Sequence, residues 1–286
     1  MATATSVQFG QYPPARRTLL HVSDTHLLAG NAPLGGRFDT AANLARTLEA
    51  AEATGIRPDA IVFTGDLTDL GEPEAYTALR AAVEPVAERL GAPVVWVAGN
   101  HDERPALRRD LLGLEPTEEP VTGVWDLGGL RLIGLDSTVP GWHHGDLDHG
   151  QLEWLRRELA TPAPLFDILE LREQGRLADV IAGTDVRAIL AGHLHYSTSG
   201  TFAGVPVSVA AATCYTMNLA RPAADVNGMD AGQSFHLVHV YDDTITHAVV
   251  PVVDAPTGDV FSAEWVERMS RLTPEERLEA FSRKRR

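Results

Sequence analysis

The sequence is poor in cysteine. Cys214 is the only one among 286 residues. A single thiol excludes both an intramolecular disulfide framework and a zinc site built from four thiolates. Any bound metal must therefore be held by oxygen and imidazole ligands, and the lack of cysteine pairs fits a reducing compartment.

Basic residues are scarce relative to acidic ones. Only 24 Lys and Arg stand against 39 Asp and Glu, which gives a formal net charge of −15. This charge would repel a polyanion unless the positive charge were concentrated in one place, so long nucleic acid is not an expected partner. Histidine is plentiful by contrast, with 11 residues. Because neutral imidazole is the commonest protein ligand for metals, the acid-rich and His-rich composition suggests a metal site.

Long apolar runs are missing as well. No stretch approaches the about 18 apolar residues that span a membrane, and residues 1–14 lack the basic start and apolar run of a secretory signal. We therefore expect a cytoplasmic protein with no integral membrane association. The motifs G-x-x-x-x-G-K-[ST], H-E-x-x-H and G-x-S-x-G are also absent, which argues against a P-loop NTPase, a zincin and a serine hydrolase.

The N-terminal third of the chain alternates between strand and helix patterns. Apolar, β-prone runs occur at 18–23, 60–64 and 94–98, and helical spacing of apolar residues occurs at 38–53 and 74–90. This alternation predicts an α/β fold with parallel strands joined by crossover helices. In such sheets ligands bind beyond the carboxyl ends of the strands.

The rest of the chain is predicted to hold fewer helices. In order, the patterns indicate a hairpin at 123–136, helices at 148–159 and 166–181, a strand at 186–191, and a β meander to 252. Since α/β chains of this length often fold as one unit, we expect a single domain over 1–286. Its core should cover about 18–252, followed by a helical tail over about 262–286.

Polar clusters directly follow four of the predicted strands. In chain order they are Asp24-Thr25-His26, Gly65-Asp66, Gly99-Asn100-His101-Asp102 and Gly192-His193-Leu194-His195. Residues two apart in an extended segment point the same way, so each D-x-H or H-x-H pair can reach one cation. Asp66 offers two oxygens that can bridge two metals, and Asn100 offers an amide oxygen. A lone pair of this kind is more often structural, but four clusters at four strand ends indicate a metal site.

These four clusters, in this order, resemble the calcineurin-like metallophosphoesterase superfamily. Residues 139–145 and 191–215 are in addition similar to the class III cyclic nucleotide phosphodiesterases of actinobacteria. The resemblance implies an αββα sandwich and a metal-dependent phosphodiesterase acting on 2′,3′- or 3′,5′-cAMP or similar small phosphodiesters. It also implies a homodimer in contact through its late β elements.

The resemblance also implies roles for individual residues. Two cations, which can be Fe, Mn or Zn, would share Asp66 and a bridging water or hydroxide. The implied metal ligands are Asp24, His26, Asp66 and His195 for one cation, and Asp66, Asn100 and His193 for the other. His101 matches the residue that contacts the phosphate and assists the leaving oxygen, with Asn100 beside it as the second catalytic residue. Asp102 would orient a neighbour.

One ligand of the family pattern is missing from this sequence. The pattern needs a further histidine, at the end of a strand before the Gly192 cluster, yet no histidine occurs from Gly150 to Gly192. That interval also has no β-type apolar run, so about 15–20 residues, a strand with its loop, are missing. We therefore expect a sandwich without one central strand and a weakened second metal site. One of His143, His144 and His149 can substitute for the ligand.

This gap keeps a second function open, a catalytically impaired metal-binding scaffold or regulatory protein. A nuclease acting on long nucleic acid is disfavoured by the net charge of −15. Outside the four clusters, Asp69 and Glu72 are expected to cap the helix that follows them. His21 is expected to be a core histidine, and Cys214 a small buried side chain.

Overall fold

The computed structural model describes residues 15–159, 173–220, 227–253, 262–277 and 279–280. Ala15–Val253 form one compact unit. Helices α6 (Ala263–Ser270) and α7 (Pro274–Arg277) belong to a second unit, and Ser262 caps the start of α6, where its hydroxyl accepts a hydrogen bond from the backbone of Trp265. A single domain over 1–286 stays a prediction.

A five-stranded sheet forms the first half of the larger unit, in the order β12-β11-β1-β2-β3. Its parallel strands are β1 (Arg17–Ser23), β2 (Ala60–Thr64) and β3 (Val94–Val97), and its antiparallel ones are β11 (Ser234–Val240) and β12 (Ile245–Pro251). Helices α1 (Thr40–Ala53) and α2 (Pro73–Leu90) are the crossovers between the parallel strands. This arrangement confirms the predicted α/β alternation.

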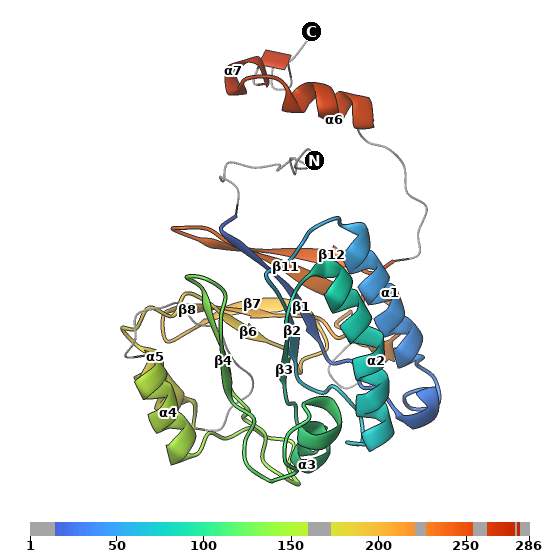
Figure 1. Ribbon diagram of the computed structural model, residues 1–286, viewed down its shortest axis with the longest axis vertical. Helices are drawn as coiled ribbons and strands as arrows, with labels where there is room; N and C mark the ends of the chain where they lie inside the picture. Colours follow the sequence, from blue (N-terminus) through green and yellow to red (C-terminus); the bar gives the residue numbers. More distant parts are fainter. Residues whose placement is uncertain (1–14, 160–172, 221–226, 254–261, 278, 281–286) are drawn as a thin grey trace. The chain divides into compact units, whose positions relative to one another are not determined.

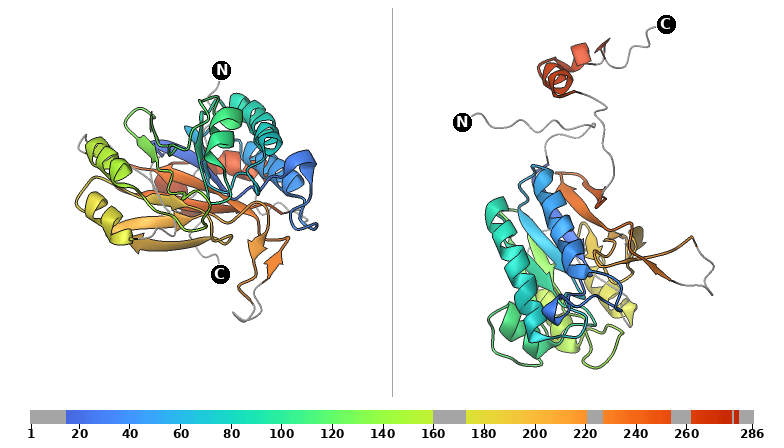
Figure 2. Two further views of the ribbon diagram at one scale, coloured as in Figure 1. Left: turned by 90° about the horizontal axis from the view of Figure 1, so that it is seen from below. Right: turned by 90° about the vertical axis from the view of Figure 1, so that its right-hand side faces the viewer.

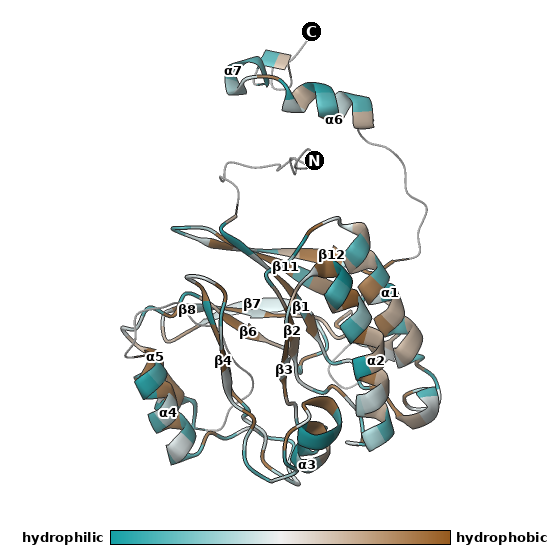
Figure 3. Cartoon of the chain, viewed as in Figure 1, coloured by the Kyte–Doolittle hydropathy of each residue, from teal (hydrophilic) through white to brown (hydrophobic). Residues whose placement is uncertain are grey.

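Alternating side chains separate the two faces of this sheet. In β2, Ile61 and Phe63 pack into the cluster under α1 and α2, whereas Ala60 and Val62 face a second cluster on the opposite side. Period-two burial of this kind is the consequence of strand geometry. Figure 2 shows α1 and α2 side by side, and Figure 3 shows the apolar strands that they cover.

A second group of strands packs against the other face of the first sheet. It consists of a three-stranded sheet in the order β6-β8-β7 and a separate hairpin, β4-β5. The strands are β4 (Gly123–Asp126), β5 (Arg131–Gly134), β6 (Ile189–Ala191), β7 (Thr198–Phe202) and β8 (Val205–Val209). Helices α4 (His149–Leu159) and α5 (Gln174–Ile181) cover their outer side. The layers are therefore helix, sheet, sheet and helix, as expected (Figure 1).

The second layer is interrupted between β5 and β6. Within the described residues, β5 pairs only with β4 and β6 only with β8. Ile133 of β5 and Ile189 of β6 nevertheless belong to one cluster, and Leu132 and Leu190 belong to another. The interruption thus agrees with the expected loss of a central strand. Residues 160–172, including the first part of the helix predicted at 166–181, lie outside the described residues.

Short elements complete the larger unit. They are α3 (Arg104–Ala106), the short helical turns η1 (Ala29–Asn31) and η2 (Leu107–Leu111), and the strands β9 (Thr216–Met217) and β10 (Gly228–Met229). Across the described residues, we find no helix with the length and apolar character needed to cross a membrane. A cytoplasmic location stays a prediction.

Candidate metal centre

The four predicted clusters meet at one edge of the sandwich. The loops after β1, β2 and β3 lie together there because parallel strands end at the same edge of a sheet. The loop after β6 joins them through the segment after β8: Ala210 donates to the carbonyl of Ala191, and Thr213 donates to the carbonyl of Ser23 at 3.2 Å. The two layers are thereby tied together next to Asp24 and His193.

Most candidate ligands lie on strained backbone. Left-handed φ angles occur at five of the six, namely Asp24 (52°), His26 (44°), Asp66 (45°), His193 (70°) and His195 (55°). Residues with a Cβ rarely adopt this conformation, and holding one there costs on the order of 1–3 kcal/mol. Such strain concentrates at functional sites, because it lets consecutive short turns aim side chains at one point.

Two glycines allow the strand ends to approach each other. A methyl group on Gly99 would overlap the backbone nitrogen and Oδ1 of Asp66. A methyl group on Gly192 would overlap the Ser23 hydroxyl and lie 2.7 Å from Oδ2 of Asp24. The glycines that begin two of the predicted clusters are therefore needed for the close packing of the candidate ligands.

Four buried side chains form one tight group of donors. The ligand atoms of Asp24, His26, Asp66 and His195 all lie within 4.8 Å of one another. Nε2 of His26 lies 3.2 Å from Nε2 of His195 and 3.5 Å from Oδ2 of Asp66. Two imidazoles and two carboxylates, with their donor atoms converging, fit a cation such as Fe, Mn or Zn.

The donors of the expected second site are spread more widely. Nδ1 of His193 lies 3.9 Å from Oδ2 of Asp66, and the backbone of His101, next to Asn100, donates to Oδ1 of Asp66 at 2.9 Å. The Asn100 amide contacts Nδ1 of His143 at 2.9 Å. His143, one of the three histidines considered as substitutes, thus contacts an expected ligand. The chemistry of this donor set also fits a cation of the same class.

The titratable side chains of the tight group shift one another's pKa values. Burial, followed by the charge of Asp66, raises the pKa of Asp24 to about 7. Burial alone would lower the pKa of His26, but hydrogen bonds with Asp66 and Asp69 raise it to about 10. Burial and then the charge of His26 lower the pKa of His195 to about 4. A cation bound among these groups would supply the positive charge that His26 offers to the neighbouring carboxylates.

Asp69 does not cap the following helix, so this expectation was wrong. Its carboxylate accepts a hydrogen bond from Nδ1 of His26 at 2.9 Å, and its carbonyl oxygen lies 2.9 Å from Nδ1 of His101. Glu72 precedes α2 without a side-chain capping bond and instead accepts from the backbone of Ala29. The loop after β2 folds back over the site, and its carboxylates bind groups from the β1 loop rather than the start of α2.

Asp102 ties together the loops after β2 and β3. Its buried carboxylate accepts hydrogen bonds from the backbones of Leu67, Thr68 and Gly99 and from the hydroxyl of Tyr76. Burial, followed by the charge of Asp66, raises its pKa to about 6. This geometry agrees with the orienting role expected for Asp102.

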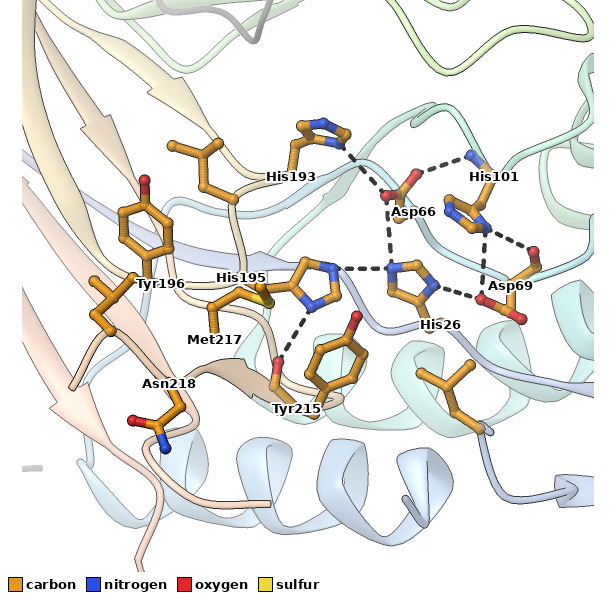
Figure 4. A pocket seen from close by; sticks show the side chains of 13 residues that line it. His26, Asp66, Asp69, His101, His193, His195, Tyr196, Tyr215, Met217 and Asn218 are labelled. Atoms are coloured by element: carbon orange, nitrogen blue, oxygen red, sulfur yellow. Dashed lines mark hydrogen bonds and ion pairs between the residues drawn. The ribbon is translucent and has the colours of Figure 1, made fainter. Parts of the chain in front are cut away.

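A cavity of about 570 Å³ opens onto the candidate ligands. His26, Asp66, His101, His193 and His195 line one part of it, and Figure 4 shows their side chains directed toward one another. The remaining part is lined by residues to which the sequence gave no binding or catalytic role: Leu34, Asp69, Leu194, Tyr196, Tyr215, Met217, Asn218 and Leu219. A cavity of this size and mixed character accommodates a nucleotide-sized ligand.

Comparison with known proteins identifies the family. Residues 17–197 match the family model of the calcineurin-like phosphoesterases. The chain belongs to this family. It is therefore a metal-binding hydrolase of the metallophosphoesterase type, as the four clusters predicted.

Curated relatives cover most of the chain. A Rhodococcus erythropolis protein named "Probable cyclic nucleotide phosphodiesterase" is 51% identical over 264 residues, covering 86% of this chain and 87% of that protein. A cAMP/cGMP dual specificity phosphodiesterase of Mycobacterium tuberculosis is 50% identical over 268 residues, covering 88% and 84%. Among solved structures, a dimetal phosphatase from Danio rerio matches with a TM-score of 0.60 at 14% identity, covering 84% of this chain and 98% of that one, which supports the fold.

Proposed function

We propose that this phosphoesterase hydrolyses the cyclic phosphodiester of 3′,5′-cyclic nucleotides, with 2′,3′-cAMP and other small diesters as further candidate substrates. The observation that carries the proposal is the convergence of acidic and imidazole donors at one end of a nucleotide-sized cavity. The names of the two relatives at about half identity support the substrate class. Water would attack phosphorus, the bond to a ribose oxygen would break, and a nucleoside monophosphate would result.

We assign the metal ligands as the sequence suggested. Asp24, His26, Asp66 and His195 would hold one cation, and Asp66, Asn100 and His193 the other. Fe, Mn and Zn all suit these nitrogen and oxygen donors. When bound, the two cations would lower the pKa of a water, orient the phosphate and neutralise developing charge.

We assign His101 the task of delivering the proton to the departing ribose oxygen. Nδ1 of His101 is held by the carbonyl oxygen of Asp69 at 2.9 Å, and the ring is partly exposed in the cavity. With Nδ1 engaged, Nε2 is the nitrogen available to a substrate. Because Nδ1–H is donated to that carbonyl, Nε2 carries a proton only in the imidazolium form; in that form, transfer of the Nε2 proton to the leaving oxygen would give a hydroxyl in place of an alkoxide and leave a neutral imidazole.

The test of this function is hydrolysis by the manganese-loaded protein. We expect turnover of cAMP and cGMP, and of bis(p-nitrophenyl) phosphate as a chromogenic diester, with 2′,3′-cAMP assayed in parallel. Asp66→Ala and Asn100→Ala should each reduce kcat/KM by about 100-fold or more, because each removes a proposed metal ligand. Glu84→Gln, an exposed carboxylate on α2, is the matched control. Activity that survives both alanine substitutions would contradict the proposal.

A second candidate function follows from the interruption between β5 and β6. If the second cation is not retained, the protein would be a metal-binding scaffold or regulatory protein with little catalysis. Elemental analysis of the purified protein separates the two functions. Two metals per chain support the enzyme, whereas one or none, together with no diester hydrolysis, supports the scaffold.

We further propose a homodimer that forms through β11 and β12. Within the described residues, β12 pairs only with β11, so its other edge is available to a second strand. Val249 on β12 is 51% exposed and offers an apolar contact on this edge strand. Pairing or packing of two such edges would cover it.

A further inference from the structure

We propose that Tyr215 binds the substrate through its phenolic hydroxyl, which donates a hydrogen bond to an anionic phosphate oxygen at the metal centre. The inference rests on the proposed function in taking a cyclic nucleotide as the substrate. The contact with a phosphate group does not depend on which phosphate compound is bound. It is carried by four features: the backbone anchoring of Tyr215, the packing of its ring, the direction of its hydroxyl, and the absence of a partner for that hydroxyl within the described residues.

The backbone of Tyr215 is anchored to two candidate ligands. The preceding residue, Cys214, donates its backbone N–H to the carbonyl of Asp24 at 3.3 Å. The carbonyl of Tyr215 lies 3.2 Å from Nδ1 of His195 and accepts its N–H. This bond leaves Nε2 of His195 directed at the other donors, as a histidine ligand requires. Tyr215 is therefore fixed relative to the site before its side chain is considered.

The ring of Tyr215 is held on three sides. Phe38 stacks on it with a centroid distance of 4.9 Å and an interplanar angle of 22°, and His195 packs against it at 4.5 Å. On the third side lies Gly228, where even a Cβ would come within 2.6 Å of Cδ2 of Tyr215. These three contacts restrict rotation of the side chain, and they therefore restrict the position of its hydroxyl.

The hydroxyl points into the cavity. Figure 4 shows it directed toward His26 and His195, above the carbonyl group that binds His195. No hydrogen bond joins this hydroxyl to any other group in the part of the chain that the structure describes, although the residue is half-buried. A hydroxyl that is held in place, partly desolvated and without a protein acceptor is suited to donate a hydrogen bond to an acceptor atom of a ligand.

A phosphate oxygen is the acceptor that matches this position. The groups around the hydroxyl are metal-ligand candidates, so the part of the substrate that reaches them is the phosphate rather than the base. Hydrogen bonds from a hydroxyl to an anionic oxygen are shorter and stronger than those between neutral groups. Because negative charge on the non-bridging oxygens persists through the displacement at phosphorus, such a bond would assist both binding and reaction.

Tyr196 provides an internal comparison. It also borders the cavity, but Figure 4 shows its hydroxyl pointing away from the histidines. Removing the hydroxyl of Tyr196 should therefore leave the phosphate untouched. Tyr215→Phe and Tyr196→Phe change one oxygen atom each, and both keep an aromatic ring in place.

The experiment compares these two variants with the wild-type protein, each loaded with manganese. Tyr215→Phe should lower kcat/KM for cAMP and for bis(p-nitrophenyl) phosphate by about 10- to 100-fold, the effect expected for one hydrogen bond to a charged group. Its dissociation constant for inorganic phosphate, measured by calorimetry, should rise at least about fivefold. Metal content and Tm should stay unchanged, and Tyr196→Phe should keep its dissociation constant for inorganic phosphate within about twofold of the wild-type value.

Three outcomes would overturn the inference. The first is a Tyr215→Phe variant with wild-type kinetics and phosphate affinity, and the second is loss of metal from that variant, which would make Tyr215 a support for His195 only. The third is a manganese-loaded wild type that binds no inorganic phosphate. Failure to hydrolyse cyclic nucleotides would instead contradict the proposed function, and the phosphate and chromogenic diester measurements would still decide the role of Tyr215.

Discussion

The carboxylate of Asp69 lies 2.9 Å from Nδ1 of His26, on the side of the ring opposite the other candidate ligands. A carboxylate in this position fixes the tautomer of a histidine ligand and raises its basicity. Nε2 of His26 is thereby kept as the atom that lies 3.2 Å from His195 and 3.5 Å from Asp66. Asp69 thus contributes to the site through His26, although the sequence did not suggest it as a ligand.

We expect Asp69→Ala to weaken metal binding by about 10- to 100-fold, since His26 would lose the partner that orients it. Titration of the metal-free protein with Mn²⁺, followed by calorimetry, measures the effect. Asp69→Asn, which keeps an oxygen acceptor, should recover part of the affinity. Glu72→Gln, on the same loop, is the control and should bind as the wild type does. Equal affinities for Asp69→Ala and the wild type would show that His26 needs no such partner.

Loss of His143 should empty the second metal site. Its Nδ1 lies 2.9 Å from the amide of Asn100, and a 180° rotation of that amide would bring Oδ1 to the same place. Two donors at this separation can share one cation, so His143 can take the position of the missing family ligand. We expect two manganese ions per chain in the wild type, one in His143→Ala, and two in His144→Ala. Elemental analysis and the spin-coupled Mn²⁺ signal measure this directly; two ions in His143→Ala would exclude the role.

The sequence predicted the candidate ligands because each is a residue of the right type directly after a strand. Asp24, Asp66 and Asn100 could be placed at one edge without coordinates, since they follow parallel strands that share their carboxyl ends. The interruption between β5 and β6 could also be expected, because residues 150–192 contain no histidine and no β-type run before the strand predicted at 186–191.

Asp69 and Tyr215 could not be predicted in the same way. An aspartate three residues after Asp66 and just before a helical pattern has the usual signature of a cap, and only the folding of its loop over the β1 loop brings it to His26. Tyr215 lies in a segment far along the chain, and its proximity to His195 depends on the hydrogen bonds between the β8 segment and β1. Contacts between loops of different strands leave no periodic signal in a sequence.

Gly99→Ala should destabilise the protein. A methyl group there would overlap the backbone of Asp66, which cannot move without displacing the candidate ligands. Overpacking of this kind costs about 1–3 kcal/mol, and it should be accompanied by weaker metal binding. Gly200→Ala is the control, because no atom lies within 4 Å of the Cβ position at Gly200. Urea unfolding of both variants in metal-free buffer compares them; equal midpoints would show that the β2 and β3 loops can separate at no cost.

A buried group of histidines outside the metal centre should make stability depend on pH. His21 and His236 are buried neighbours on β1 and β11, with ring centroids 5.8 Å apart. Burial, and then the charge of nearby histidines, lowers the pKa of His21 well below its usual value, and lowers that of His236 to about 4. Both are therefore neutral in the folded protein at pH 7.

The direction of the effect follows from proton binding. The unfolded chain, with histidine pKa values near about 6.5, binds more protons than the folded one between that pH and about 4. The contribution of these histidines to the free energy of unfolding is therefore fully present above about pH 6.5. It falls as the pH is lowered, by up to about 1.4 kcal/mol per pH unit for each histidine. His236→Gln should reduce the slope of unfolding free energy against pH in metal-free protein, whereas the exposed control His149→Gln should not. An unchanged slope in His236→Gln would mean that His236 is protonated in the fold.

Introducing a charge on β12 should dissociate the proposed homodimer. Val249 is 51% exposed on a strand that pairs only with β11 in the described structure. Val249→Lys would bring two lysines close to a shared interface, where like charges repel and their desolvation is costly. Light scattering should then give the mass of one chain for the variant and of two chains for the wild type. Leu114→Lys, at an exposed leucine outside this strand, is the control. Because the candidate metal centre lies at the end of β1 rather than at β12, the monomeric variant should keep its metals; a wild type that is already monomeric would rule out the dimer.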